Sequence, residues 1–503
     1  MSLLLLTVDE MKRAEAAAME AGASSADLMR RAGEGAAAIL TGNGEPRPAA
    51  VLCGPGANGG DGLVIARVLK EAGWPVRAGV LGGRAALSGD AAAMADAYGG
   101  DIEDLSTDIV KGAGVIVDAL FGTGLTRPIE GAAAAIVEAA NAHARETGAP
   151  VLAVDIPSGV NADTGAVMGA VIRANATATF FLRKPGHVLF PGRAVCGQVQ
   201  LVDIGIGADV LEKIRPNTAE NQPQLWGAQF PRPSFQTHKY MRGGVAVVTG
   251  PRFSTGAARL GAEAALRAGA GAVTLLSPVS AADENAAHAT ALMVRIADSS
   301  DHITSFLDDR RYRAVLFGPG AGVGPATRDK VLSILKTEAS AVFDADALTS
   351  FEGDGEALFG PLRPDDVITP HEGEFMRVFA GLIETPSDRL GAARAAAKKA
   401  DCIVVLKGAD TVVAAPDGRA SINTNAPPDL ATAGAGDVLA GFIAGLRAQG
   451  MPAFEAASAG VWLHGACGQT AGPGLVSEDL AVALPSVYRA LFAPPERKDA
   501  ESA

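Results

Sequence analysis

The sequence has few cysteines, and they lie far apart. Only four occur in 503 residues (Cys53, Cys196, Cys402 and Cys467), and no two form a C-x-x-C pair. This spacing argues against a disulfide framework and against a zinc knuckle. Long apolar runs are also scarce, since "MSLLLLTVDEMKR" (1–13) has only four consecutive leucines before acidic residues appear. Such a run is too short for a signal-peptide core or a membrane span, so we expect a cytoplasmic protein without a membrane partner.

A block of basic residues is missing as well. The chain has 43 Lys and Arg against 56 Asp and Glu, which gives a net charge of −13. Proteins that bind nucleic acid usually carry a basic stripe, so we expect no nucleic-acid partner. A small anionic ligand remains compatible with this charge, because backbone amides at helix N-termini bind phosphate without lysine.

Glycine is abundant, at 61 residues, and short apolar strands that end in Gly, Asp or Pro alternate with helical segments. The strands expected in the first half are 49–54, 76–82, 114–122 and 150–159, and the rhythm restarts at 243. This alternation predicts an α/β fold with parallel sheets that are covered on both faces. A stretch rich in Pro, Asn and Gln interrupts the rhythm. We therefore expect two domains, 1–215 and 236–493, with a linker at 216–235 and a tail at 494–503.

The segment "GPGANGGDG" (54–62) places five glycines, one Asn and one Asp directly after an expected strand. We expect its glycines to adopt positive φ and to let a ligand approach the main chain. A helix expected from about Leu63 would offer free N–H groups to an anion. The segment matches neither a Walker A loop nor a clean G-x-G-x-x-G. A tight turn without a ligand is an equal alternative.

Two further strand ends carry polar side chains. "VDALFGTGLTRP" (117–128) places Asp118 before a glycine-rich loop, and "VDIPSGV" (154–160) contains Asp155 and Ser158. Each Asp follows an apolar run, where burial is costly without a partner. Asn58, Asp118 and Ser158 offer oxygen ligands, which suit a hard cation. Helix capping is the alternative for each Asp, but three polar strand ends at one sheet edge favour a ligand site.

On the motifs "LMRRAG" (28–33), "GPGANGGDGLV" (54–64), "VDALFGTGL" (117–125) and "VDIPSGVNADTG" (154–165), residues 1 to about 215 resemble the NAD(P)H-hydrate epimerase, or YjeF N-terminal, family. The resemblance implies a Rossmann-like three-layer αβα domain with a K⁺ ion near Asn58, Asp118 and Ser158. It implies contacts to hydrated NAD(P)H from Ala57, Asn58, Gly59, Gly60, Asp61, Gly122, Thr123, Gly124, Leu125, Thr126, Arg127, Pro128 and Asp155. Ala57 departs from the family, which usually has Asn there, so one side-chain hydrogen bond is lost.

The chemistry of this substrate explains a carboxylate at the site. Hydrated NAD(P)H carries a hydroxyl on the ring carbon next to nitrogen, so its epimers interconvert when the hydroxyl leaves and water returns to the other face. An acid/base group within hydrogen-bond reach accelerates such an exchange. We assign this role to Asp155, with a contact to ribose or amide as the alternative.

A second glycine turn, "AGAGD" (433–437), precedes a helical pattern that starts at or just after Asp437. Helix N-terminal amides beside a carboxylate suit phosphoryl transfer to a hydroxyl. The amides stabilise charge on the transferred group, and the carboxylate takes the hydroxyl proton. The alternative is that Asp437 only caps the helix.

On "GAARLGAEAALRAGAGAVTL" (256–275), "GPGAG" (318–322), "FDADAL" (343–348), "TPHEGEF" (369–375), "VVLKGADTVVAAPDG" (404–418) and "GAGDVLAGFIAGLRAQG" (434–450), residues 236 to 492 resemble the ADP/ATP-dependent NAD(P)H-hydrate dehydratase family, a ribokinase-like α/β fold. The resemblance implies substrate contacts from Ala257, Gly320, His371 and Asp437. It implies nucleotide contacts from Lys407, Gly408, Ala409, Asp410, Thr411 and Gly436. Asp344 and Asp346 either position Mg²⁺ or cap the next segment. Ala435 and Glu372 depart from the usual Thr and Pro.

The two resemblances together imply one chain with two activities, which are epimerisation of hydrated NAD(P)H and its dehydration through phosphorylation of the ring hydroxyl. We expect ADP as phosphate donor, with ATP possible, and a homo-oligomer. One alternative is a small-molecule kinase of the vitamin-precursor type, which leaves the "ANGGDG" domain unexplained. The other is a first domain that binds dinucleotide without catalysis.

Overall fold

The computed structural model describes residues 3–42, 44–382 and 388–493. The chain splits into two compact units, Met1–Thr218 and Ala219–Ala503. The tail expected at 494–503 lies outside the described residues. Within the described part, every helix is too short or too polar to cross a membrane.

The first unit is built around a parallel sheet of seven strands in the order β4-β3-β2-β5-β6-β7-β8. Its strands are β2 (Ala49–Cys53), β3 (Val76–Val80), β4 (Ile102–Asp104), β5 (Val115–Ala119), β6 (Val151–Val154), β7 (Ala176–Phe180) and β8 (Gln198–Val202), preceded in the chain by the short β1 (Leu4–Leu5). The chain runs outward from β2 to β4 and then returns to β5, so the strand order reverses between β2 and β5. Ligands of such sheets bind beyond the carboxyl ends of the strands at this reversal.

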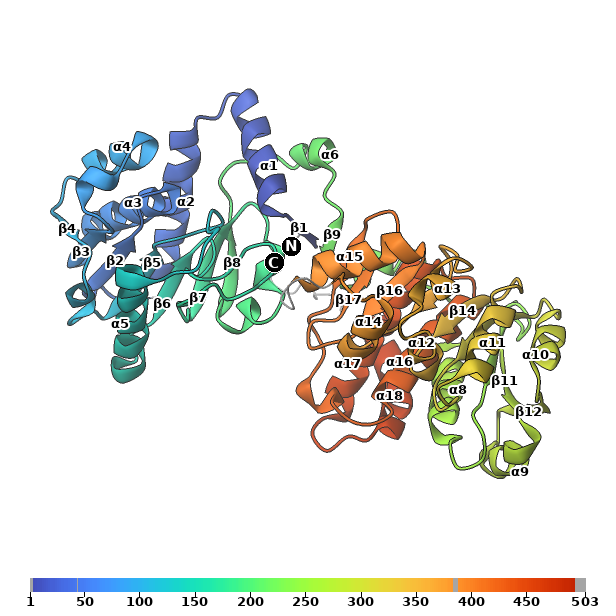
Figure 1. Ribbon diagram of the computed structural model, residues 1–503. Helices are drawn as coiled ribbons and strands as arrows, with labels where there is room; N and C mark the ends of the chain where they lie inside the picture. The colour runs from blue at the N-terminus through green and yellow to red at the C-terminus, as the bar shows by residue number, and fades with distance from the viewer. Residues whose placement is uncertain (1–2, 43, 383–387, 494–503) are drawn as a thin grey trace, which may run out of the picture. The chain divides into compact units, whose positions relative to one another are not determined.

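Helices cover both faces of the first sheet, because successive residues of a strand point to opposite sides. Val51 and Cys53 of β2 belong to a core shared with α1, α2 and α3, whereas Ala50 and Leu52 pack with α5. Figure 1 shows α2 and α3 on one side of this sheet and α5 on the other. The helices are α1 (Val8–Glu20), α2 (Ser25–Thr41), α3 (Ala57–Glu71), α4 (Gly89–Tyr98), α5 (Gly131–Thr147) and α6 (Val210–Ile214). The expected Rossmann-like αβα layering is confirmed.

The second unit contains a mixed sheet with the order β9-β18-β17-β16-β15-β14-β13-β10-β11-β12. Pairing is parallel from β16 through β15, β14, β13, β10 and β11 to β12, and antiparallel between β16, β17 and β18. The strands are β9 (Thr218–Glu220), β10 (Gly244–Val248), β11 (Ala272–Ser277), β12 (Met293–Ile296), β13 (Tyr312–Phe317), β14 (Ser340–Phe343), β15 (Val367–Ile368), β16 (Ile403–Leu406), β17 (Val412–Ala414) and β18 (Ala420–Ile422).

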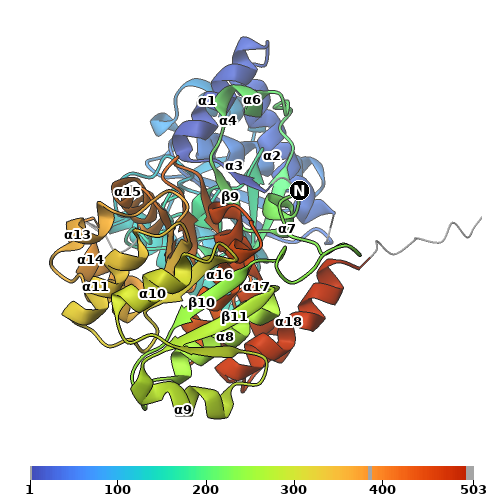
Figure 2. The ribbon, with the colours of Figure 1, turned by 90° about the vertical axis from the view of Figure 1, so that its right-hand side faces the viewer.

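Two groups of helices enclose the second sheet, as the expected α/β class requires. Figure 2 shows α17 and α18 on one side and α10, α11, α14 and α15 on the other. The longer helices are α8 (Gly256–Ala268), α9 (Val279–His288), α10 (Ser300–Leu307), α11 (Pro325–Ile334), α14 (Glu372–Val378), α15 (Arg389–Ala400), α16 (Ala435–Ala448), α17 (Ala453–Ala471) and α18 (Ser477–Leu491). Short helices complete the unit: α7 (Pro223–Trp226), α12 (Asp346–Thr349) and α13 (Gly355–Phe359).

Helices α8 and α16 pack closely because glycines remove side chains from their contact. A Cβ on Gly441 would lie 2.2 Å from the carbonyl oxygen of Gly261, and one on Gly445 would lie 2.5 Å from that of Ala265. The paired positions advance together along the two helices, so the helices run parallel. Their N-termini therefore meet at the same edge of the sheet.

Much of the segment expected to be a linker, 216–235, is folded. It forms β9 and α7, and the Trp226 side chain is 1% exposed. Asn221 donates through its side chain to the carbonyl oxygen of Ser458, and Trp226 packs on Phe230 with ring centroids 5.5 Å apart. The many proline and polar residues of this segment suggested a linker. The contacts that fold it come from a single tryptophan and one buried amide, which composition does not reveal.

All four cysteines are buried and free. Burial raises the pKa of Cys196 and of Cys467 to about 12. Cysteine pairing therefore contributes nothing to holding the fold together, as the spacing indicated.

Two candidate active sites

The glycine-rich segment 54–62 leads into the first turns of α3, which starts at Ala57 and not near Leu63. None of its five glycines has positive φ, contrary to expectation. Close packing requires Gly54, Gly59, Gly60 and Gly62 instead, whereas a Cβ on Gly56 would meet no atom within 4 Å. A Cβ on Gly59 would lie 1.8 Å from the carbonyl oxygen of Gly54, and one on Gly62 would lie 2.6 Å from the Cβ of Ala119. The start of α3 is thus pressed against the ends of β2 and β5, at the reversal of the sheet.

Asn58 joins this helix start to two other strand ends. Its side-chain amide lies between the carbonyl oxygen of Val154, at 3.2 Å, and the N–H of Gly122, at 3.3 Å, and satisfies both when its nitrogen faces Val154. A Cβ on Gly122 would lie 3.0 Å from the Asn58 amide and 3.4 Å from Asp155 Oδ2. The structure therefore brings Asn58, Gly122 and Asp155 together, as their places at strand ends suggested.

Asp118 is fully buried and bound to Ser158. The Ser158 hydroxyl donates to Asp118 Oδ1 at 2.6 Å, and the Ser158 N–H donates to Oδ2 at 2.8 Å. The Ser158 hydroxyl also accepts from the N–H of Phe121 at 2.9 Å. Burial raises the pKa of Asp118 to about 6 despite these bonds. Asn58, Asp118 and Ser158 all bind to the turn around Leu120–Gly122, so their oxygens share one neighbourhood.

Asp155 follows β6 with a left-handed backbone, φ 64°, which non-glycine residues rarely adopt. Its Oδ1 accepts from Lys184 Nζ at 2.7 Å, and its Oδ2 faces the N–H of Thr123 at 3.4 Å. Burial alone would raise the pKa of Asp155, but the charge and hydrogen bond of Lys184 outweigh it and lower the pKa. The site thus holds an ionised carboxylate beside a buried lysine.

His187 fixes the backbone under Asp155. Its Nδ1 accepts from the N–H of Lys184 at 2.9 Å, so Nε2 carries the proton and donates to the carbonyl oxygen of Asp155 at 2.8 Å. Burial lowers the pKa of His187 to about 4, which keeps the ring neutral. The Lys184–His187 turn therefore positions the carboxylate from behind.

Asp61 is the second carboxylate of this site. It lies in α3 and is 9% exposed. Burial and the nearby charges of Asp155 and Glu15 raise its pKa well above the usual value. Two carboxyl groups of one site whose pKa values move in opposite directions are suited to act as acid and base.

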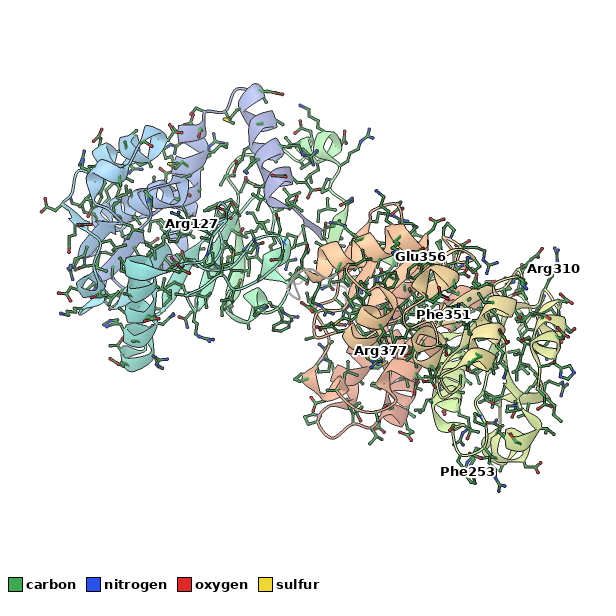
Figure 3. The ribbon with its side chains drawn as sticks, in the orientation of Figure 1. Arg127, Phe253, Arg310, Phe351, Glu356 and Arg377 are labelled. Atoms are coloured by element: carbon green, nitrogen blue, oxygen red, sulfur yellow. The ribbon has the colours of Figure 1, made fainter. Side chains whose placement is uncertain are left out.

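The remaining predicted contacts of the first site are more exposed. Ala57 opens α3 at the surface, and in the loop after β5 Gly124, Thr126, Arg127 and Pro128 are exposed while Thr123 and Leu125 are half-buried. Figure 3 labels Arg127 in this loop. The structure brings Gly122 and Thr123 to the carboxylates and leaves the rest of the loop open to solvent.

In the second unit, glycine loops after β10 and β13 press together at the carboxyl edge of the sheet. A Cβ on Gly250 would lie 1.8 Å from the carbonyl oxygen of Gly320. Gly320 has φ 67°, and a Cβ there would lie 3.7 Å from the Cβ of Ala257. The predicted substrate contacts Ala257 and Gly320 are therefore neighbours.

Asp437 is the third residue of α16, which starts at Ala435 after Gly434 with φ 87°. The helix thus begins two residues earlier than expected. Burial raises the pKa of Asp437 to about 7, and the negative charge of Asp344 adds to this. A carboxyl group that titrates near neutral pH at a helix N-terminus can serve as a general base.

Lys407, after β16, is the cation of this site. Its Nζ lies 2.6 Å from Asp344 Oδ1 and 3.8 Å from Glu374 Oε2. A Cβ on Gly436 would lie 3.3 Å from Lys407 Nζ. Burial alone would lower the pKa of Lys407, but Asp344 and Glu374 raise it, so it stays charged. Lys407, Asp344 and the N-terminus of α16 therefore converge on one place.

His371 caps α14 and keeps part of its ring exposed. Its Nδ1 accepts from the N–H of Glu374 at 3.3 Å, and its own N–H donates to Glu374 Oε2 at 2.8 Å. The side chain is 53% exposed. His371 thus has the structural role that was the alternative to a ligand contact. Its ring is exposed enough to contact a ligand as well.

The segment Lys407–Thr411 forms a turn that Arg389 holds from below. Thr411 Oγ1 donates to the carbonyl oxygen of Gly408 at 2.9 Å. Arg389 donates to the carbonyl oxygen of Lys407 at 3.0 Å and pairs through Nε with Asp410 at 2.9 Å. Asp410 is 2% exposed, so its carboxylate supports the turn. Ala409 lies on the exposed side of this turn.

The two aspartates after β14 have different partners. Asp344 pairs with Lys407, whereas Asp346 opens α12 and accepts from the N–H of Gly322 at 2.8 Å. Across the described ranges, no group of three or more His, Cys, Asp and Glu side chains is placed to hold a metal ion. Asp346 thus fastens the glycine loop after β13.

Comparison with known proteins assigns both halves. The family models that match are the YjeF-related protein N-terminus at residues 25–186 and NAD(P)H-hydrate dehydratase at residues 245–481. The bifunctional NAD(P)H-hydrate repair enzyme Nnr of Moorella thermoacetica is 38% identical over 467 residues, which cover 88% of this chain and 87% of the relative. The Thermofilum pendens enzyme of the same name is 35% identical and covers 98% of this chain and 97% of the relative.

This chain belongs to the family of bifunctional NAD(P)H-hydrate repair enzymes. Among solved structures, an ADP/ATP-dependent NAD(P)H-hydrate dehydratase from Bacillus subtilis, co-crystallized with ATP/Mg²⁺, covers 54% of this repair enzyme and 98% of its own chain, with 25% sequence identity and a TM-score of 0.48.

Sequence reasoning about this repair enzyme missed the residues that act from behind the sites. They are Thr179, Lys184 and His187 in the first unit, and Glu374 and Arg389 in the second. A lysine and a histidine three residues apart, directly after an apolar strand in "FFLRKPGH" (180–187), were the available signal for the first group. Arg389 gave none, because it lies 17 residues from the backbone that it holds.

Proposed function

We propose that the first unit epimerises hydrated NADH and NADPH and that the second dehydrates the S epimer with ADP. The observation that carries the first half is the pair Asp61 and Asp155, two carboxyl groups at the reversal of the sheet with oppositely shifted pKa values. The glycine-rich start of α3 and the loop from Gly122 to Pro128 would bind the dinucleotide.

In the epimerase, protonated Asp61 gives its proton to the departing ring hydroxyl, and water forms. The ring nitrogen supplies the electron pair that expels it. Ionised Asp155 then takes a proton from the water that adds to the other face. Lys184 keeps Asp155 ionised between turnovers.

Potassium fits the neighbouring oxygen cluster. The buried Asp118 carboxylate is bound by a hydroxyl and backbone N–H groups, all neutral, so a cation would compensate its charge. Asn58, Asp118 and Ser158 would hold it. A bound K⁺ would supply a fixed positive charge at the end of β5.

In the dehydratase, the convergence of Asp437, Lys407 and the α16 N-terminus carries the proposal. The ring hydroxyl attacks the terminal phosphorus of ADP while Asp437 takes its proton, and AMP leaves. The ring nitrogen then expels phosphate, a much better leaving group than hydroxide, and NAD(P)H is restored. Lys407 and the amides of Ala435 and Gly436 stabilise the transferred group.

Magnesium would enter with the nucleotide, where it neutralises phosphate charge. Asp344 and Glu374 are the carboxylates that face this place, although Asp344 is already paired with Lys407. The turn from Lys407 to Thr411 would hold the nucleotide, and Ala257, Gly320 and His371 the substrate.

The test follows absorbance at 340 nm with both epimers of hydrated NADH, K⁺, Mg²⁺ and either ADP or ATP. Recovery of both epimers supports both halves and identifies the donor. Recovery that stops at the S fraction would leave the first unit as a binding module. A stable phosphorylated product would favour the small-molecule kinase, which the match of both halves to the repair family disfavours.

Three further parts of the proposal have separate tests. Replacing K⁺ by Na⁺ should slow epimerisation and leave dehydration of the S epimer unchanged. Light scattering on the intact protein tests the expected homo-oligomer, and cell fractionation tests the cytoplasmic location.

A further inference from the structure

The loop between β10 and α8 presents an unusual aromatic residue. Phe253 is 85% exposed and has φ 73°. A left-handed backbone is costly for a bulky side chain, and such strain gathers at functional sites. An exposed ring recovers none of that cost by burial in the fold.

Glu284 of α9 holds the loop in this conformation. Its carboxylate accepts from the N–H of Phe253 at 3.0 Å and from Thr255 Oγ1 at 2.6 Å. These two bonds lower the pKa of Glu284, so the carboxylate is ionised at neutral pH. The backbone is thus fastened on one side while the ring stays in solvent, beside α9 in Figure 3.

The strained loop borders the substrate site of the second unit. A Cβ on Gly320 would lie 2.5 Å from the carbonyl oxygen of Ser254, the residue next to Phe253. A Cβ on Gly261 of α8 would lie 3.1 Å from the backbone oxygen of Asp437. The five residues from Gly256 to Gly261 rise about 8 Å along the helix, and Phe253 lies beyond its start. The start of α8, which follows the Phe253 loop, therefore lies about 8 Å along the helix from the contact with Asp437.

We propose that Phe253 forms a stacking subsite for the adenine ring of the hydrated dinucleotide. The inference rests on the proposed dehydratase function and deepens it. Hydration removes the aromaticity of the nicotinamide ring, which must also present its hydroxyl to Asp437. Adenine is then the aromatic ring of this substrate that is free to stack at the distal end. The Arg252 guanidinium, 5.0 Å from the Phe253 ring centroid, adds positive charge near the dinucleotide phosphates.

The test uses Phe253→Gly in the intact protein, because glycine accepts the left-handed backbone and should keep or raise the melting temperature. KM for hydrated NADH should rise about tenfold to a hundredfold, the range expected for one lost base stack, with kcat unchanged. Phe253→Trp should keep KM near that of the parent protein. Phe235→Gly is the matched control, because Phe235 is fully exposed and lies outside both sites.

Hydrated reduced nicotinamide mononucleotide, which lacks adenosine, separates stacking from loop shape. Its KM should be the same for the parent protein and Phe253→Gly. An unchanged KM for the dinucleotide, or an equal rise for both substrates, overturns the inference. A smaller oligomer for Phe253→Gly than for the parent protein in light scattering also overturns the inference. The ring would then lie at a contact between copies of the chain.

Direct binding keeps the inference apart from the proposed function. Calorimetric titration with NADH and with reduced nicotinamide mononucleotide needs no turnover. Weaker binding of NADH alone to Phe253→Gly supports the subsite, and equal binding contradicts it. An inactive parent protein would instead reject the dehydratase function.

Discussion

Single residues with opposite electrostatic surroundings define the first site. Asp155 has Lys184 at 2.7 Å, whereas Asp61 sits in α3 with burial and negative neighbours. The same chemical group therefore has a lowered pKa at one position and a raised pKa at the other, as the proposed base and acid require. Sequence reasoning found both residues from their motifs, but it could not tell the acid from the base. The burial of Asp61 and the pairing of Asp155 with Lys184, 29 residues away, appear only in the folded chain.

The pH dependence of epimerisation follows from this pair. Because the pKa of Asp155 is lowered, the base stays ionised to a lower pH than an ordinary Asp, and because the pKa of Asp61 is raised, the acid keeps its proton to a higher pH. We expect kcat/KM to fall on the alkaline side. Asp61→Asn should lower the rate about a hundredfold and remove that alkaline limb. Exposed Asp101→Asn is the control, and an alkaline limb that persists in Asp61→Asn contradicts the assignment.

The rate of dehydration should fall on the acidic side of its pH profile, opposite to the alkaline fall of epimerisation. Asp437 must be ionised to accept the hydroxyl proton, and its pKa is raised to about 7. The rate of the S epimer with ADP should therefore fall tenfold per pH unit well below 7 and level off above it. Asp437→Asn should lower kcat at least about a hundredfold. Asp429→Asn, in the short 3-10 helix Pro428–Leu430, is the control and should leave kcat unchanged. A pH-independent rate between 5.5 and 7 would rule out Asp437 as the base.

Among the elements, α3 shows what a sequence pattern conveys and what it hides. The run "ANGGDG" indicated a close approach, and the strand at 49–53 matches the expected run 49–54, whereas the strand expected at 150–159 covers only 151–154. The sequence alone could not show that the glycines after Ala57 lie in the helix, because a positive φ and close packing both require glycine. The Gly54 carbonyl oxygen beside Gly59, which only the structure shows, identifies close packing as the reason for glycine there.

Gly59→Ala tests this packing role. Alanine normally favours a helix, but its Cβ would lie 1.8 Å from the Gly54 carbonyl oxygen. We expect the free energy of unfolding of the first unit to fall by about 3 kcal/mol in urea denaturation. Gly124→Ala has open space around its Cβ and should change stability by less than about 0.5 kcal/mol. Equal stability of the two variants would show that α3 can move away from the sheet.

Two other segments were not predicted correctly from the sequence. The apolar run 402–416 turned back on itself as β16 and β17, an antiparallel pair around the Lys407–Thr411 turn. The polar segment at 216–235 is held by Trp226, which packs against Trp462 of α17 and shares a core cluster with residues of α18, all far along the chain. Local composition carries no information about partners that distant.

On the scale of the whole molecule, the two activities should be separable. Asp155→Asn should recover NADH from the S epimer alone, apart from spontaneous epimerisation, whereas Asp437→Asn should recover none. An equimolar mixture of the two variants should restore recovery from both epimers, because the substrate is a small molecule that diffuses between proteins. Time courses at 340 nm at two protein concentrations measure this. A mixture that recovers only the S fraction would mean that the epimer passes within one chain.

The four buried cysteines bear on the conditions in which this enzyme works. Peroxides and alkylating reagents attack the thiolate, and burial with pKa values near 12 at Cys196 and Cys467 leaves almost none of it at neutral pH. Iodoacetamide should therefore label no cysteine in the native protein within an hour and all four after unfolding. An enzyme whose thiols are all buried can keep restoring reduced cofactor while oxidative stress inactivates enzymes that depend on a reactive cysteine.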